Sequence, residues 1–142
     1  MLIKEKFTDK IISPKIAARI FQAVLAMSDK TDRQKEHFWA MGLNAQNQVI
    51  YLELVSLGIL TASLVHPREL FCTAIKKKAA AIIVAHNHPS GDPTPSSVDK
   101  KIAKKLKAAG GLICIKIIDN IIIANGTKKY ASQCKKTLNR PC

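Results

Sequence analysis

Residues 80–99 read Ala-Ala-Ile-Ile-Val-Ala-His-Asn-His-Pro-Ser-Gly-Asp-Pro-Thr-Pro-Ser-Ser-Val-Asp. The six apolar residues at the start of this stretch are typical of a buried strand. Because side chains alternate between the two faces of a strand, His86 and His88 leave from the same face, with their Cα atoms about 6.6 Å apart. The Gly- and Pro-rich residues that follow predict a loop, and Asp99 then falls in the first turn of a predicted helix.

This pattern predicts a metal site. Two imidazole nitrogens on one strand face can bind one cation at roughly 2.0–2.1 Å each. With Asp99, His86 and His88 form a candidate set of three zinc ligands, which leaves a fourth tetrahedral position for water, as in catalytic zinc sites. The alternative for Ser96 and Asp99 is a helix cap, since a hydroxyl followed three residues later by an acid is a capping pattern. A cap does not account for the two histidines, so the metal site is favoured.

The sequence on both sides of this stretch predicts an α/β fold. Helices are expected at 13–28, from Pro67 to about Lys78, and from Ser96 to a stop at Gly110-Gly111. Strands are expected at 38–43, 49–57, 80–85, 112–118 and 120–124, with shorter ones at 59–61 and 130–131. This order predicts a single domain with a mixed β-sheet flanked by helices, its core at about 13–131 and a polar tail at 132–142.

The four cysteines are predicted to be structural or exposed rather than metal ligands. The chain has no Cys-x-x-Cys pair, and a domain of this size does not need disulfides. Cys72 and Cys114 are therefore expected to be small core residues, as is Ile75 on the second predicted helix. Cys134 and Cys142 lie in the polar tail and are expected to be exposed thiols.

The composition favours a cytoplasmic globular domain. The chain has 142 residues, of which 47% are hydrophobic. No apolar run approaches the ~20 residues that cross a bilayer, and the first ten residues carry too many charges for a signal peptide. We therefore expect no membrane association.

The net charge of +13 has two interpretations. Clustered lysines can form an electrostatic footprint for nucleic acid, and the candidates here are Lys100, Lys101, Lys104 and Lys105. Alternatively, the lysines form a solvated surface without a single partner. Only four of the 23 basic residues are arginine and aromatics make up 5% of the chain, which argues against base-specific recognition. Weak, salt-dependent DNA binding stays open as a hypothesis.

The stretch 86–99 resembles the motif of the JAMM (MPN+) metalloproteases, His-x-His, seven residues, then Ser-x-x-Asp. The fuller string, together with Val-His-Pro-Arg-Glu at 65–69 and Asp-Asn-Ile-Ile at 119–122, is similar to the RadC branch of this superfamily. The similarity runs from about residue 13 to residue 130. RadC proteins usually carry an N-terminal helix-hairpin-helix region, which we expect this chain to lack. Many members have Asp-His where this chain has Asp119-Asn120.

The resemblance implies an MPN/JAB-like fold, a sandwich similar to that of the cytidine deaminases, with one zinc ion held by His86, His88 and Asp99. It also implies a bound water as nucleophile and an upstream glutamate as general base. We assign Glu36 to this role, with Glu69 as the rival, although dipole stabilisation at a helix start alone explains an acid at position 69. By the same resemblance, Ser96 helps to stabilise the oxyanion.

Two functional hypotheses follow. The first is a zinc-dependent hydrolase of amide bonds, a peptidase or isopeptidase acting on a peptide substrate. The second is a non-catalytic, basic nucleic-acid-binding accessory protein in DNA repair or mobile-element biology, the setting that the historical name of the RadC family suggests. The adjacent His-Asn-His letters do not indicate an HNH nuclease, in which these residues are dispersed over a ββα unit.

Overall fold

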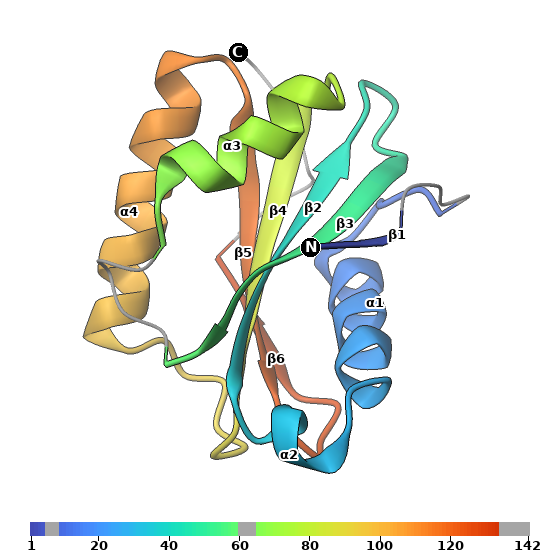
Figure 1. Ribbon diagram of the computed structural model, residues 1–142, viewed down its shortest axis with the longest axis vertical. Helices are drawn as coiled ribbons and strands as arrows, with labels where there is room; N and C mark the ends of the chain where they lie inside the picture. The colour runs from blue at the N-terminus through green and yellow to red at the C-terminus, as the bar shows by residue number, and fades with distance from the viewer. Residues whose placement is uncertain (5–8, 60–64, 134–142) are drawn as a thin grey trace.

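A mixed β-sheet forms the centre of the computed structural model, which describes residues 1–4, 9–59 and 65–133 (Figure 1). Within these residues the sheet has six strands in the order β1-β3-β2-β4-β5-β6. The strands are β1 (Leu2–Lys4), β2 (Glu36–Leu43), β3 (Val49–Gly58), β4 (Ala81–His88), β5 (Lys116–Ala124) and β6 (Tyr130–Ser132). The helices of the described part are α1 (Pro14–Ala26), α2 (Lys30–Arg33), α3 (Pro67–Lys76) and α4 (Ser97–Leu112).

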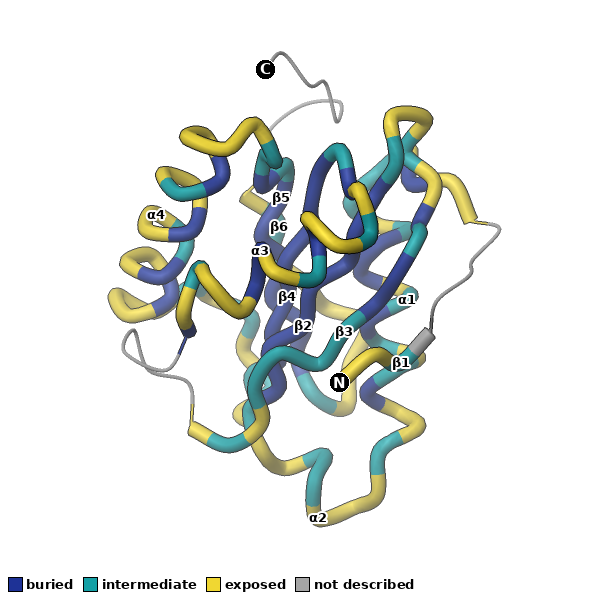
Figure 2. The backbone as a smooth tube through the Cα atoms, turned by 45° about the horizontal axis from the view of Figure 1, so that its top comes forward, coloured by how far each residue is buried: buried dark blue, intermediate teal, exposed yellow. Residues whose placement is uncertain are grey.

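The helices cover both faces of the sheet, with α1 on one face and α3 and α4 on the other (Figure 1). The α1 face buries a core that includes Phe21, Trp39 and Ile83. The α3–α4 face buries a second core that includes Phe38, Tyr51 and Leu106. Figure 2 shows the central strands buried between these layers. The predicted mixed sheet flanked by helices is confirmed.

Strand β4 lies at the centre of the sheet and is the strand that ends at the histidines. It pairs antiparallel with β2 and parallel with β5, and α4 makes the connection to β5. Because helices cover both of its faces, β4 is buried almost throughout, which explains its continuous apolar run. The sheet therefore holds the end of β4 rigidly beside the start of α4.

The hairpin of β2 and β3 and the helix α1 lie where the sequence predicts them, but two predicted boundaries are wrong. Helix α4 does not stop at Gly110-Gly111 but continues to Leu112, and β5 begins at Lys116 instead of residue 112. Strand β5 does not break near Asp119. Asp119 pairs with Ile83, and the register against β4 shifts just before it, so that Ile118 is the extra residue on β5.

Two predictions about buried side chains are also wrong. Cys72 and Cys114 are exposed free thiols, and Ile75 is 60% exposed. On α3 the core-facing residues begin at Leu70, and a rotation of 100° per residue turns position 72 away from the sheet. Cys114 lies in the turn after α4, with φ of 55°. Cys134 and Cys142 lie outside the described residues. Of the short strand expected at 59–61, Ile59 forms a bend after β3, and the other two residues lie outside the described part.

No described helix has the length and apolar character that crossing a bilayer requires.

Candidate metal centre

The three predicted metal ligands meet where the end of β4 faces the start of α4. The two histidines come from β4 and the acid from the first turn of α4. The Nε2 atoms of His86 and His88 are 3.2 Å apart, and Asp99 places Oδ1 3.1 Å from His86 Nε2 and Oδ2 3.0 Å from His88 Nε2. His86 and Asp99 are buried, and His88 is partly buried. This group could hold a metal ion.

The distances between the candidate ligand atoms are of the size that a tetrahedral cation requires. Bonds of roughly 2.0–2.1 Å give a tetrahedron with edges of about 3.3 Å. The two imidazole nitrogens are 3.2 Å apart, and each lies 3.0–3.1 Å from a different oxygen of Asp99. Atoms that offer lone pairs repel one another at these distances unless a proton or a cation lies between them. The donor set of two imidazoles and one carboxylate is one that zinc accepts.

A backbone carbonyl orients one of the imidazoles. His88 Nδ1 lies 2.7 Å from the carbonyl oxygen of Asp92, in the loop between β4 and α4. Because a carbonyl only accepts, Nδ1 carries the proton and Nε2 presents its lone pair to the centre. The sequence offers no signal for this contact, because any residue at position 92 has the same carbonyl. His86 Nδ1 is buried and finds no hydrogen-bond partner within the described part of the chain.

Asp99 serves as both cap and candidate ligand. Ser96 Oγ accepts a hydrogen bond from Asp99 N at 3.1 Å, and Ser96 N donates to Asp99 Oδ2 at 2.8 Å, which completes a capping box. Burial raises the pKa of Asp99, but the hydrogen bond and charge of His86 and the hydrogen bonds from Ser96 outweigh it, so this pKa lies well below its ordinary value. The carboxylate is therefore ionised at neutral pH, as a metal ligand must be. The two interpretations of this motif are compatible.

The strand register places Glu36 on the same face of the sheet as the two histidines. Phe38 pairs with His86, and their rings stack with centroids 6.3 Å apart. Glu36 is partly buried, and because it lies two residues before Phe38 on β2, strand alternation places it on the same face as His86. Glu69, the rival, is exposed in the first turn of α3. The strand pairing thus brings Glu36 and the candidate ligands to one end and one face of the sheet.

The candidate nucleic-acid-binding lysines lie on two different sides of α4. All four are exposed. Lys100 and Lys104 line a hollow of about 530 Å³ together with Lys107 and Ser132. Lys105 instead donates a hydrogen bond to the carbonyl of residue 65, and Lys101 lies one turn before it. The structure therefore does not bring the four lysines together as one patch.

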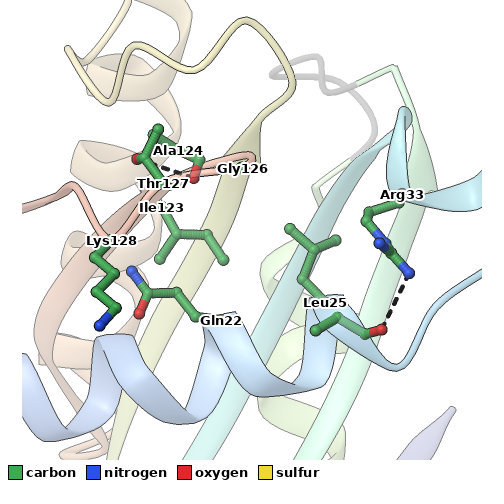
Figure 3. Close-up of a pocket in the computed structure, with 9 residues that line it drawn as sticks. Gln22, Leu25, Arg33, Ile123, Ala124, Gly126, Thr127 and Lys128 are labelled. Atoms are coloured by element: carbon green, nitrogen blue, oxygen red, sulfur yellow. Dashed lines mark hydrogen bonds between the residues drawn. The ribbon is translucent and has the colours of Figure 1, made fainter. Parts of the chain in front are cut away.

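An open hollow of about 460 Å³ lies on the opposite face of the sheet from the candidate metal centre (Figure 3). Gln22 and Leu25 of α1 form one wall, and residues 123–128 form another. Arg33 closes one end, where its guanidinium donates to the carbonyl of Ala26 at 3.1 Å. None of the three candidate ligands lines this hollow, so it is separate from the centre.

The fold and the three converging side chains define an α/β domain with a candidate metal centre of the JAB type. The family model described as "RadC-like JAB domain" matches residues 11–138. The chain therefore belongs to the family of RadC-like JAB domains, and the resemblance in the sequence is confirmed.

Proteins named UPF0758 are among the relatives. One from Desulforamulus reducens is 50% identical over 114 residues, which cover 80% of this chain and 49% of that protein. One from Symbiobacterium thermophilum is 56% identical over 91 residues, covering 64% of this chain and 39% of that protein. One from Clostridium botulinum is 47% identical over 122 residues, covering 86% and 53% respectively. The chain thus spans about half the length of the curated relatives it matches.

Proposed function

We propose that this chain is a zinc-dependent hydrolase of amide bonds, a peptidase or isopeptidase of the JAMM type. The observation that carries the proposal is the convergence of His86, His88 and Asp99 to within 3.0–3.2 Å of one another. A zinc ion held by these three residues would act as a Lewis acid and would lower the pKa of a bound water to ≈ 7. Two imidazoles and one carboxylate are a ligand set of catalytic zinc sites.

Glu36 acts as the general base in this proposal. Its position on β2, two residues before the partner of His86 and on the same face of the sheet, supports the assignment. The carboxylate accepts the proton that water loses as it attacks the carbonyl carbon, and then returns a proton to the leaving amine. A positioned base of this kind typically contributes 10²- to 10⁴-fold in rate.

Ser96 stabilises the oxyanion in this proposal. Its Oγ accepts the capping hydrogen bond from Asp99 N, so the hydroxyl proton stays available for donation to a developing negative charge. Removing a preorganised donor of this kind costs roughly 10²- to 10³-fold in kcat.

Matched variants of the two candidate bases test the proposal. Zinc-loaded protein is assayed against fluorogenic peptide and isopeptide libraries, and zinc content is measured by atomic emission. We expect E36Q to retain about one zinc per chain and lose 10²- to 10⁴-fold in turnover, whereas E69Q keeps wild-type turnover. H88A should lose the zinc. Zinc retained by H88A would show that the ligand set is wrong, and full turnover by E36Q would remove Glu36 from the mechanism.

A second candidate function is binding of nucleic acid by α4. The hollow beside Lys100 and Lys104 favours it, because two lysines one turn apart can contact consecutive phosphates. The double variant K100Q/K104Q should weaken binding to single-stranded DNA and reduce its salt dependence, whereas K101Q/K105Q, which alters the other side of α4, should change it less. Equal effects of the two double variants would refute a site at this hollow.

A further inference from the structure

Asn87 lies between the two candidate histidine ligands and has no exposed surface. Strand alternation sends its side chain to the face of the sheet opposite His86 and His88. A buried asparagine must satisfy its amide hydrogen bonds inside the protein. Its partners therefore show which part of the fold it holds.

Asn87 binds the backbone on both sides of Glu36. Its Oδ1 accepts a hydrogen bond from His37 N at 2.6 Å, and its Nδ2 donates to the carbonyl of Lys35 at 3.1 Å. The partners fix the orientation of the amide, because a backbone N–H only donates and a carbonyl only accepts. One side chain thus holds the residues that precede and follow the candidate base.

A second asparagine holds this amide in place. Asn87 Nδ2 also donates to Asn125 Oδ1 at 2.9 Å, and Asn125 Nδ2 donates to the carbonyl of Arg33 at 2.6 Å. The backbone N–H of Asn125 donates to the carbonyl of His88 at 3.2 Å. The network therefore connects the segment before β2 to the end of β4.

These side-chain contacts lie where the backbone pairing of β2 with β4 ends. The last paired residues are Phe38 and His86, so the ladder does not reach position 36. The candidate ligands do not depend on this region, because β4 remains paired with β5 as far as His88 and the capping box holds Asp99. On its other side Glu36 pairs with Gly58 of β3, so Asn87 holds the backbone around Glu36 on the side that faces β4.

We infer that Asn87 is a positioning residue that sets the place of Glu36 relative to the metal centre, an inference that rests on the proposed function. Only asparagine suits the position among residues of its size. Aspartate has no N–H to donate to the carbonyl of Lys35, and serine is too short to reach both backbone partners. The role is carried out through Glu36, without contact to the metal or the substrate.

The test uses zinc ions as the probe and needs no substrate. The chain has four glutamates, so carbon-13 labelling of their side-chain carboxyl groups gives a simple NMR spectrum. The signal missing from E36Q identifies Glu36. In the wild type, this signal should shift when zinc is added. In Asn87→Ser, we expect the shift to fall below half of the wild-type value, while zinc affinity from chelator competition stays within about threefold of the wild-type affinity.

Asn120→Ala is the matched control. Asn120 is a buried asparagine on the neighbouring strand β5, and its Oδ1 has no hydrogen-bond partner among the described residues. This variant should give the wild-type shift of the Glu36 signal. Asn87→Asp keeps the acceptor for His37 N and loses the donor to Lys35, so we expect an intermediate shift. It also provides a second variant should Asn87→Ser fail to fold.

A measurement on zinc-free wild-type protein tests the network itself. The His37 amide should exchange its hydrogen slowly in the wild type and in Asn87→Asp, which keeps the acceptor, and at least tenfold faster in Asn87→Ser. Fast exchange of this amide in the wild type would overturn the inference without any variant.

The remaining outcomes separate the inference from the proposed function. An unchanged Glu36 shift in both Asn87 variants would overturn the positioning role alone. So would a tenfold or greater loss of zinc affinity in Asn87→Ser, since Asn87 would then support the ligands. A wild-type Glu36 signal that does not respond to bound zinc would remove Glu36 from the centre, and the proposed mechanism would fail together with the positioning role.

Discussion

Zinc should stabilise this fold, and His88→Ala should abolish that effect. The folded chain holds candidate ligand atoms of three residues within 3.0–3.2 Å of one another, whereas in the unfolded chain Asp99 is separated from the histidines by a loop of ten or more residues. Zinc should therefore bind the folded state in preference. At a free zinc concentration of 100 times Kd, this preference raises the free energy of unfolding by about 2.7 kcal/mol.

The expected change in melting temperature follows from the size of the chain. An unfolding entropy of about 2.1 cal/mol/K per residue gives roughly 0.3 kcal/mol/K for 142 residues. A stabilisation of about 2.7 kcal/mol then raises Tm by about 9 °C. The assay is thermal unfolding followed by circular dichroism, once with a chelator and once with buffered zinc.

His66→Ala is the control for this experiment. His66 is exposed before α3, its side chain makes no capping hydrogen bond, and it is not one of the candidate ligands. We expect the zinc-dependent rise in Tm to persist in His66→Ala and to fall below about 2 °C in His88→Ala. A rise of several degrees in His88→Ala would show that zinc stabilises the protein from another site, and the reasoning from the ligand distances would be refuted.

Four predictions concern packing and ionisation. A Cβ added at Gly110 would lie 2.5 Å from the backbone oxygen of Ile115, so Gly110→Ala should lower the free energy of unfolding by about 1–3 kcal/mol, measured in urea. A Cβ added at Gly111, the next residue of α4, would meet no atom within 4 Å, so Gly111→Ala should raise the free energy of unfolding by about 0.5–1 kcal/mol. A lower free energy of unfolding in this variant would contradict the helical assignment of Gly111. A Cβ at Gly42 would overlap the ring of Tyr51 at 1.9 Å, so Gly42→Ala should lower Tm by several degrees, and unchanged Tm would refute this close contact. Burial raises the pKa of Tyr51, so above pH ~10 the unfolded state loses the phenol proton before the folded state does. The free energy of unfolding should therefore fall with pH by up to ~1.4 kcal/mol per pH unit more steeply in the wild type than in Tyr51→Phe. Parallel pH profiles of the two proteins would contradict this prediction.

The sequence predicts the ligand set because each constraint on it is local. Alternation along a strand places His86 and His88 on one face, and the spacing of a capping box places Asp99 in the first turn of a helix. The apolar run before the histidines identifies the buried strand on which they lie. Only the approach of β4 to α4 is non-local, and the short loop between them leaves few alternatives.

The errors at the end of α4 arise from contacts that the sequence does not reveal. Two consecutive glycines usually mark the end of a helix. Here Gly110 is needed inside the helix because the backbone at Ile115 and the ring of Phe71 approach closely. The local pattern predicts the wrong boundary because the requirement comes from tertiary packing, and the exposure of Cys114 follows from the same displaced turn.

The contacts of Asn87 join residues that lie far apart in the sequence. As the middle residue of the His-Asn-His string, it has no role as a ligand, and its backbone partners at Lys35 and His37 are 52 and 50 residues away. A periodic sequence pattern cannot indicate that positions so far apart are neighbours. They become neighbours because β2 and β4 lie side by side in the sheet. The candidate ligands are specified by short-range patterns, but the position of the candidate base depends on contacts between β2 and β4. If the proposed function holds, disturbing these contacts should displace the base and leave the metal bound, which is why the measurement of Glu36 in the Asn87 variants discriminates better than metal content alone.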